Sequence, residues 1–238
     1  MIEKRVALVT GANKGIGRQI AAQLAARGVT VVLAARDDTR RAEAATALGV
    51  DSVRLDVTDP ASARAAAEHV ERRHGRLDVL VNNAGITGGS FDPPSRIDVD
   101  VARRVFDTNY FGVIAVTNAM LPLLRRSPAA RIVNVSSSVG SFAATSTPGS
   151  ALASLPPSVT YPTSKTALNA LTVQYAKELA PEGILVNAAC PGWCATDLNG
   201  NAGDRTPEQG AAIAVELATL PDGGPTGGFF DDGGPVPW

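Results

Sequence analysis

The fold is decided near the amino terminus by residues 6–17, which read VALVTGANKGIG. The apolar and β-branched start predicts a buried strand, the glycines predict a tight turn, and an amphipathic helix is expected to begin at the turn's end. Glycines let a backbone approach a pyrophosphate, and the N–H groups and dipole of a helix amino terminus stabilise its charge. The stretch therefore predicts a nucleotide-binding unit, although such turns also occur merely to close tight packing.

The same strand-then-helix pattern recurs along the chain. Strands are expected near residues 5–10, 29–35, 51–56, 77–82, 130–136, 184–189 and 226–230. Helices are expected near residues 15–28, 38–48, 60–74, 98–126, 162–180 and 207–219. This alternation predicts an α/β fold: a single-domain Rossmann-type doubly wound sheet of about seven parallel strands with helices on both faces. Residues 1–238 are expected to form one domain, with residues 141–160, rich in Ser, Ala, Pro and Gly, as a loop insertion beside the site.

The charge balance and the few cysteines and histidines argue against several classes of partner and ligand. The 22 basic and 23 acidic residues leave a formal charge of -1, so neither nucleic acid nor an anionic membrane is an expected partner. Cys190 and Cys194 match neither a disulfide framework nor zinc spacing, and His69 and His74 have no carboxylate partner at ligand spacing, so no metal is expected. The apolar segment after the first residues is too short for a signal or membrane span, which implies a cytoplasmic protein.

Basic residues follow the second expected strand. Arg36 ends that strand, Arg40 lies one turn further, and Lys14 stands in the glycine turn. An acid at this position would accept a hydrogen bond from a ribose 2′-hydroxyl, whereas cations accommodate a 2′-phosphate. The cluster favours NADPH or NADP⁺, although Asp37 and Asp38 follow at once and a solvated charged face is the alternative.

Tyr161 and Lys165 are the candidate reacting residues. Four positions apart, they lie on the same side of a helix, and Pro162 suits the first turn of that helix. A free tyrosine has a pKa near 10, and an adjacent ammonium that favours the phenolate makes proton exchange easier. The pair alone carries little weight, because these residue types often meet at this spacing by chance.

Two further polar positions are expected near this pair. Residues 136–138 are serines at the carboxyl end of an apolar strand, where a hydroxyl can hydrogen-bond a carbonyl oxygen, or can simply end the strand. Asn109 lies on the apolar stripe of a long expected helix, so its buried amide should hold a water or a backbone group. A purely structural bond is the alternative for Asn109.

Taken in order, these motifs resemble the short-chain dehydrogenase/reductase family from residue 6 to about residue 191. The motifs are TGANKGIG at 10–17, NNAG at 82–85, the helix asparagine at 109 and YxxxK at 161–165. Residues 35–37 with Arg40, and CPGW at 190–193, resemble the NADPH-dependent carbonyl reductase branch.

The resemblance implies reversible reduction of a ketone or aldehyde of a hydrophobic small molecule to an alcohol. Tyr161 would be the general acid, Lys165 would lower its pKa and bind the nicotinamide ribose, Asn109 would hold a proton-relay water, and Ser137 would polarise the substrate. The implied cofactor-binding residues are Gly11, Asn13, Lys14, Gly15, Ile16, Gly17, Arg36, Arg40, Asp56, Val57, Asn82, Ala84, Gly85, Tyr161, Lys165, Pro191, Gly192, Trp193 and Thr196. The implied substrate-binding residues are Ser137, Val139, Tyr161 and Trp193.

Several alternatives remain open. The 24 positions from Ser137 to Tyr161 and the short segment after Gly192 depart from familiar relatives, so pocket shape and the choice between monomer and homo-oligomer do not transfer. A redox sensor that binds NADP without chemistry would keep the glycine turn but need not keep the reacting residues. A nucleotide-sugar epimerase or dehydratase normally has a further carboxyl-terminal domain, and the roughly 45 residues after Gly192 are too few for one.

Overall fold

The computed structural model describes residues 5–89 and 92–238. Strands in these ranges form one eight-stranded sheet in the order β3-β2-β1-β4-β5-β6-β7-β8. The strands are β1 (Val6–Thr10), β2 (Thr30–Ala35), β3 (Asp51–Arg54), β4 (Val79–Asn82), β5 (Arg131–Val135), β6 (Leu185–Ala189), β7 (Phe229–Asp231) and β8 (Gly234–Pro235). Strands β1 to β7 pair in parallel, which confirms the predicted fold class. The two-residue β8, antiparallel to β7, was not predicted.

Helices connect these strands. They are α1 (Gly15–Ala26), α2 (Asp38–Leu48), α3 (Pro60–His74), α4 (Val99–Phe106), α5 (Gly112–Leu124), α6 (Phe142–Ser146), α7 (Tyr161–Leu179) and α8 (Pro207–Ala218), with short 3₁₀ turns that include η2 (Ser138–Gly140) and η4 (Asp197–Asn199). The single helix expected over 98–126 is instead α4, a π-helical turn η1 (Asp107–Phe111) and α5. The predicted loop at 141–160 contains the short helix α6.

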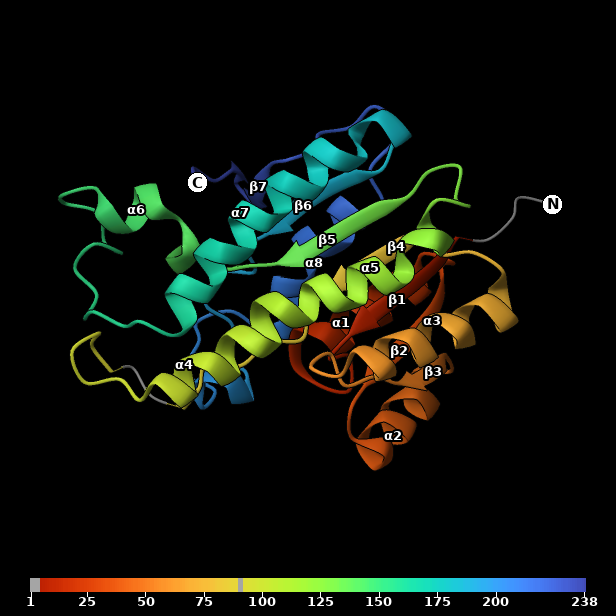
Figure 1. Ribbon diagram of the computed structural model, residues 1–238, viewed down its shortest axis with the longest axis horizontal. Coiled ribbons are helices and arrows are strands. Elements are labelled where there is room, and N and C mark those ends of the chain that lie inside the picture. Colours follow the sequence, from red (N-terminus) through yellow and green to blue (C-terminus); the bar gives the residue numbers. More distant parts are fainter. Residues whose placement is uncertain (1–4, 90–91) are drawn as a thin grey trace.

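The sheet is covered on both faces, as Figure 1 shows. Leu8 and Val32 belong to a core with α3, α5 and α7, whereas their neighbours Ala7 and Val31 belong to a second core with α1, α2 and α8. Successive strand residues point to opposite faces, so these largely apolar strands pack against two helix layers at once.

The strand order reverses between β1 and β4, and this reversal positions the site. Because ligands bind at the carboxyl ends of parallel strands where the order reverses, the turn after β1 and the segment after β4 face one crevice. The segment after β5 and the beginning of α7 reach the same edge.

Asp51 lies near both histidines, a proximity that the sequence spacing does not reveal. Oδ2 of Asp51, in β3, lies 3.0 Å from Nε2 of His69 and 3.5 Å from Nε2 of His74, both in α3. Across residues 5–89 and 92–238, no cluster of three or more His, Cys, Asp or Glu side chains has the geometry to hold a metal ion.

None of the helices in the described ranges combines the length and apolar character needed to cross a bilayer. Residues 1–4, on which the expectation of a missing signal segment partly rests, lie outside the described residues.

Candidate active site

The glycine turn between β1 and α1 has no room for a side chain at Gly11 or Gly17. Gly11 has a φ of +62°, and a Cβ built on it would lie 2.9 Å from the Ala84 Cα. A Cβ on Gly17 would lie 2.3 Å from Nδ2 of Asn83 and 2.6 Å from the Gly11 oxygen. The Lys14 side chain at the N-cap makes no capping bond, so the first N–H groups of α1 are available to an anion.

The segment after β4 is tied to this turn by Thr10. Thr10 Oγ1 accepts hydrogen bonds from the backbone N–H of Asn83 at 2.9 Å and of Ala84 at 3.0 Å. Asn82, expected to line the cofactor, instead points into the interior, where its Nδ2 donates to Oγ1 of Thr117 and Oδ1 of Asn134. Neighbouring strand residues face opposite sides, so Asn83 lines the pocket in its place.

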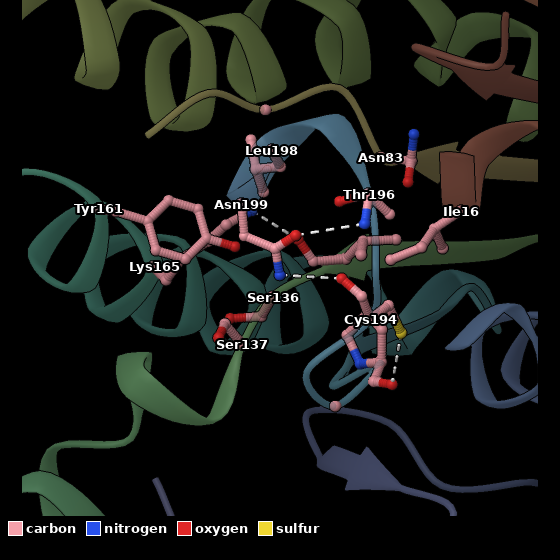
Figure 2. A pocket seen from close by; sticks show the side chains of 14 residues that line it. Ile16, Asn83, Ser136, Ser137, Tyr161, Lys165, Cys194, Thr196, Leu198 and Asn199 are labelled. Atoms are coloured by element: carbon pink, nitrogen blue, oxygen red, sulfur yellow. Dashed lines mark hydrogen bonds between the residues drawn. The ribbon is translucent and has the colours of Figure 1, made fainter. Parts of the chain in front are cut away.

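A pocket of about 110 Å³ opens at this edge of the sheet (Figure 2). Its lining consists of Ile16, Asn83, Gly85, Val135, Ser136, Ser137, Tyr161, Lys165, Pro191, Gly192, Cys194, Thr196, Leu198 and Asn199. The structure therefore brings the predicted Ser137, Tyr161 and Lys165 together with the predicted Ile16 and Gly85, and with the loop after β6. The predicted substrate contacts Val139 and Trp193 do not line it, and the Trp193 side chain is 60% exposed.

Tyr161 and Ser137 both line the pocket, and their side chains are hydrogen-bonded to each other. Burial raises the pKa of Tyr161 to about 12, and a hydrogen bond with the Ser137 side chain acts in the opposite direction. The tyrosine therefore carries its proton at neutral pH.

Lys165 is the residue expected to lower the pKa of Tyr161, whereas burial is the largest influence on that pKa and raises it. Its Nζ lies 5.5 Å from the centre of the tyrosine ring and donates to the Val135 oxygen at 2.7 Å, so it lies over the ring. Burial lowers the pKa of Lys165 to about 8, which leaves the ammonium mostly charged at neutral pH.

Asn109 lies in the π-helical turn and is fully buried. Its Nδ2 donates to the Ile86 oxygen at 2.9 Å and to Oγ of Ser164 at 3.0 Å, while its Oδ1 accepts from the Ile86 N–H at 2.9 Å. The expected backbone partner is therefore Ile86. Ser164 in turn donates to the Tyr161 oxygen, so Asn109 links the segment after β4 to the first turn of α7.

The three basic residues expected to accommodate a 2′-phosphate, Lys14, Arg36 and Arg40, are all exposed. Arg36 and Arg40 lie at the end of β2 and in α2. The acidic residue Asp37 was the reason for doubt about NADPH. Its carboxylate is the N-cap of α2, where Oδ1 accepts a hydrogen bond from the Arg40 N–H at 2.9 Å. Lys14 forms an exposed ion pair with Asp197 at 2.7 Å, which joins the glycine turn to η4.

Two residues expected around the adenine follow β3. Burial raises the pKa of Asp56, but hydrogen bonds from Thr58 and the charges of Arg36 and Arg54 outweigh it and hold the pKa below its usual value. Val57 packs against the start of α5, since a Cβ on Gly112 would lie 3.0 Å from its Cγ2.

Comparison with known proteins identifies the family. The short chain dehydrogenase family matches residues 5–207. The chain belongs to this family. The chain is 36% identical to a protein of Saponaria officinalis named short-chain dehydrogenase/reductase 1, with 97% of this chain and 95% of that protein covered. It is also 36% identical to carbonyl reductase [NADPH] 1 of Rattus norvegicus, with 99% of each covered.

A solved relative has the same fold over the whole chain. The NADPH-bound carbonyl reductase from chicken fatty liver superimposes with a TM-score of 0.87 at 30% identity, and each chain is covered completely.

In this short-chain dehydrogenase the loop after β6 forms the remaining wall. Asn199 Nδ2 donates to the Cys194 oxygen at 2.9 Å, and its Oδ1 accepts from the Thr196 N–H at 3.2 Å (Figure 2). Both Cys190 and Cys194 are buried, and burial raises the pKa of each thiol, so neither is a ready nucleophile.

Sequence reasoning missed several residues of the dehydrogenase site. Asn83, Cys194, Leu198 and Asn199 line the pocket without having been predicted there, and Ser136 lines it although Ser137 was the serine of the run that was assigned a role. Ser136 and Asn83 each adjoin a predicted residue, so a signal existed, but the direction of each side chain depends on the strand before it.

Proposed function

We propose that the protein is an NADPH-dependent oxidoreductase that reversibly reduces a ketone or aldehyde of a hydrophobic small molecule to an alcohol. The observation that carries the proposal is the convergence of Ser137, Tyr161 and Lys165 on one pocket beside the glycine turn. The carbonyl reductases among the relatives support the same reaction class.

The residues present fit a bound dinucleotide phosphate. Gly11 and Gly17 let the turn pack directly against Ala84 and Asn83, and no side chain caps the first N–H groups of α1, which leaves these groups for a pyrophosphate. Lys14, Arg36 and Arg40 would receive a 2′-phosphate. When bound, NADPH supplies the hydride that the carbonyl carbon accepts.

The protein's own side chains would then polarise and protonate the carbonyl oxygen. Ser137 donates a hydrogen bond to it, and Tyr161 gives it the phenolic proton as the C–O double bond becomes an alcohol. The charged Lys165 stabilises the phenolate left behind, and a water at the free lone pair of Asn109 Oδ1 would restore the proton from solvent. A tyrosine that holds its proton at neutral pH suits the reductive direction.

Apolar side chains at the mouth favour a hydrophobic substrate. Leu198 lines the pocket and is 42% exposed, and Ile86, next to the lining residue Gly85, is 38% exposed. Exposed apolar side chains beside a pocket commonly contact an apolar ligand.

Loss of NADPH absorbance with 4-nitrobenzaldehyde, acetophenone, menthone and UDP-glucose tests the reaction. Tyr161→Phe should lower turnover by at least ~10²-fold, because a positioned general acid is worth about 10² to 10⁴, and should leave the NADPH dissociation constant within about twofold. Tyr175→Phe is the matched control, because Tyr175 lies on the same helix and its hydroxyl bonds Asn118, outside the pocket.

The outcomes separate the alternatives. Substantial reductase activity in Tyr161→Phe would refute the general-acid role. Wild-type protein that binds NADPH tightly but turns over no carbonyl would favour a non-catalytic redox sensor. A wild-type preference for NADH would refute the cofactor assignment.

A further inference from the structure

Asn169 lies on the same side of α7 as the two reacting residues. It follows Lys165 by four positions and Tyr161 by eight, and positions at this spacing share a helix face. The Asn169 side chain is 3% exposed, so its amide needs partners inside the protein.

Both functional groups of this amide are bonded to the segment that carries Ser137. Oδ1 accepts from the Ser136 hydroxyl at 2.5 Å, and Nδ2 donates to the Gly140 oxygen at 3.1 Å. A backbone carbonyl can only accept, so the orientation of the amide is defined by Gly140. One side chain therefore bonds residues 136 and 140, on either side of residues 137–139.

The same segment packs closely on α7. A Cβ built on Gly140 would lie 2.7 Å from Cβ and 2.8 Å from the carbonyl carbon of Lys165. Within the turn, the Gly140 N–H donates to the Ser137 oxygen at 2.9 Å. The position of Ser137 relative to Tyr161 thus depends on how this short turn is held against the helix.

We propose that Asn169 is a positioning residue: it fastens both ends of the Ser136–Gly140 turn to α7 and so sets the Ser137 hydroxyl against Tyr161. The inference rests on the proposed roles of Ser137 and Tyr161. Asn169 is not among the residues that line the pocket, so it would act only through the turn. Misplacing a reacting group by about 1 Å can cost roughly 10²-fold in rate, which makes such a fastening consequential.

A double-mutant cycle between Asn169→Leu and Ser137→Ala is the direct test. Leucine keeps the shape of asparagine and removes both polar atoms. Asn169→Leu alone should lower kcat with 4-nitrobenzaldehyde by about 10- to 100-fold while the KM for NADPH stays within about twofold. In the Ser137→Ala background the same change should cost less than about threefold, because the hydroxyl that it positions is already gone.

Thr172→Val is the matched control, since Thr172 is fully buried on the same helix and its hydroxyl accepts from Asn134 Nδ2 at 2.9 Å without bonding the turn. Its kcat should remain within about threefold of wild type. Independent, multiplying losses for Asn169→Leu and Ser137→Ala, or an unchanged kcat in Asn169→Leu, would overturn the proposal.

Two further measurements keep the proposal testable. If Asn169→Leu does not fold, Ser136→Ala removes one of the two bonds and should show the same dependence on Ser137; independence would overturn the proposal. A crystal structure of Asn169→Leu, or of Ser136→Ala if the former does not fold, gives a readout that needs no turnover: the turn should be displaced from α7, and an undisturbed turn would contradict the inference. Activity retained by Tyr161→Phe would instead refute the proposed function.

Discussion

Replacing Gly11 with alanine should destabilise the protein more than the same replacement at Gly49. Both glycines have left-handed backbones, with φ of +62° and +65°, so an alanine at either position costs roughly 1 to 2 kcal/mol. At Gly49, the C-cap of α2, a new Cβ would meet nothing within 4 Å. At Gly11 it would lie 2.9 Å from the Cα and 3.3 Å from the backbone nitrogen of Ala84.

The clash at Gly11 is with backbone, which cannot rotate away. Overpacking of this kind adds about 1 to 3 kcal/mol, so we expect about 2 to 5 kcal/mol for Gly11→Ala and about 1 to 2 kcal/mol for Gly49→Ala. Urea unfolding of the two variants measures the difference, and a fluorescence titration measures NADPH binding. The displaced turn should weaken NADPH binding by more than about tenfold in Gly11→Ala alone. Equal destabilisation by the two changes, or full NADPH affinity in Gly11→Ala, would refute the argument.

Two further predictions concern charged groups. Burial lowers the pKa of Lys165 from 10.5 to about 8, so between these values the unfolded chain binds a proton that the folded chain does not, and stability should rise with pH. The rise should reach about 3 kcal/mol at 1.36 kcal/mol per pH unit, and Lys165→Met should remove it in urea midpoints measured from pH 7 to 10.5; parallel curves would contradict the burial argument. Asp197→Asn should tighten NADPH binding a few-fold at low salt and leave NADH binding unchanged, because it frees Lys14 and removes a negative charge near Arg40. Asp100→Asn, which breaks an exposed pair with Arg103 on α4, should change neither affinity, and a tighter NADH complex in Asp197→Asn would show that the 2′-phosphate is not involved.

The parallel sheet was predictable because its central strands are largely apolar on both faces and glycines mark the first turn. The π-helical turn around Asn109 was not, because one widened turn hardly disturbs the spacing of apolar residues in a helix. The two-residue β8 is too short to produce a pattern at all.

Side-chain direction explains most of what was missed in the site. A one-residue difference in a strand moves a side chain to the opposite face, so NNAG alone does not tell whether Asn82 or Asn83 reaches the pocket. The pKa of Tyr161 is raised mainly by burial, which depends on the tertiary fold and is not visible in the spacing of Tyr161 and Lys165. The position of Asn169 on the Lys165 side of the helix could have been predicted from its spacing in the sequence. Its hydrogen-bond partners could not, because they lie on another segment.

Helix α6 buries none of its residues, and the far end of the chain holds it by main-chain oxygens. Oγ of Ser141 donates to the Pro237 oxygen at 2.6 Å, and the Ala143 N–H donates to the Trp238 oxygen at 2.8 Å, with the Trp238 ring stacked on Phe229. Because the accepting atoms are main-chain oxygens, this attachment depends little on which side chains α6 carries, and its Phe142 is 70% exposed. We therefore expect that this segment can be lengthened, shortened or redesigned without rebuilding the sheet.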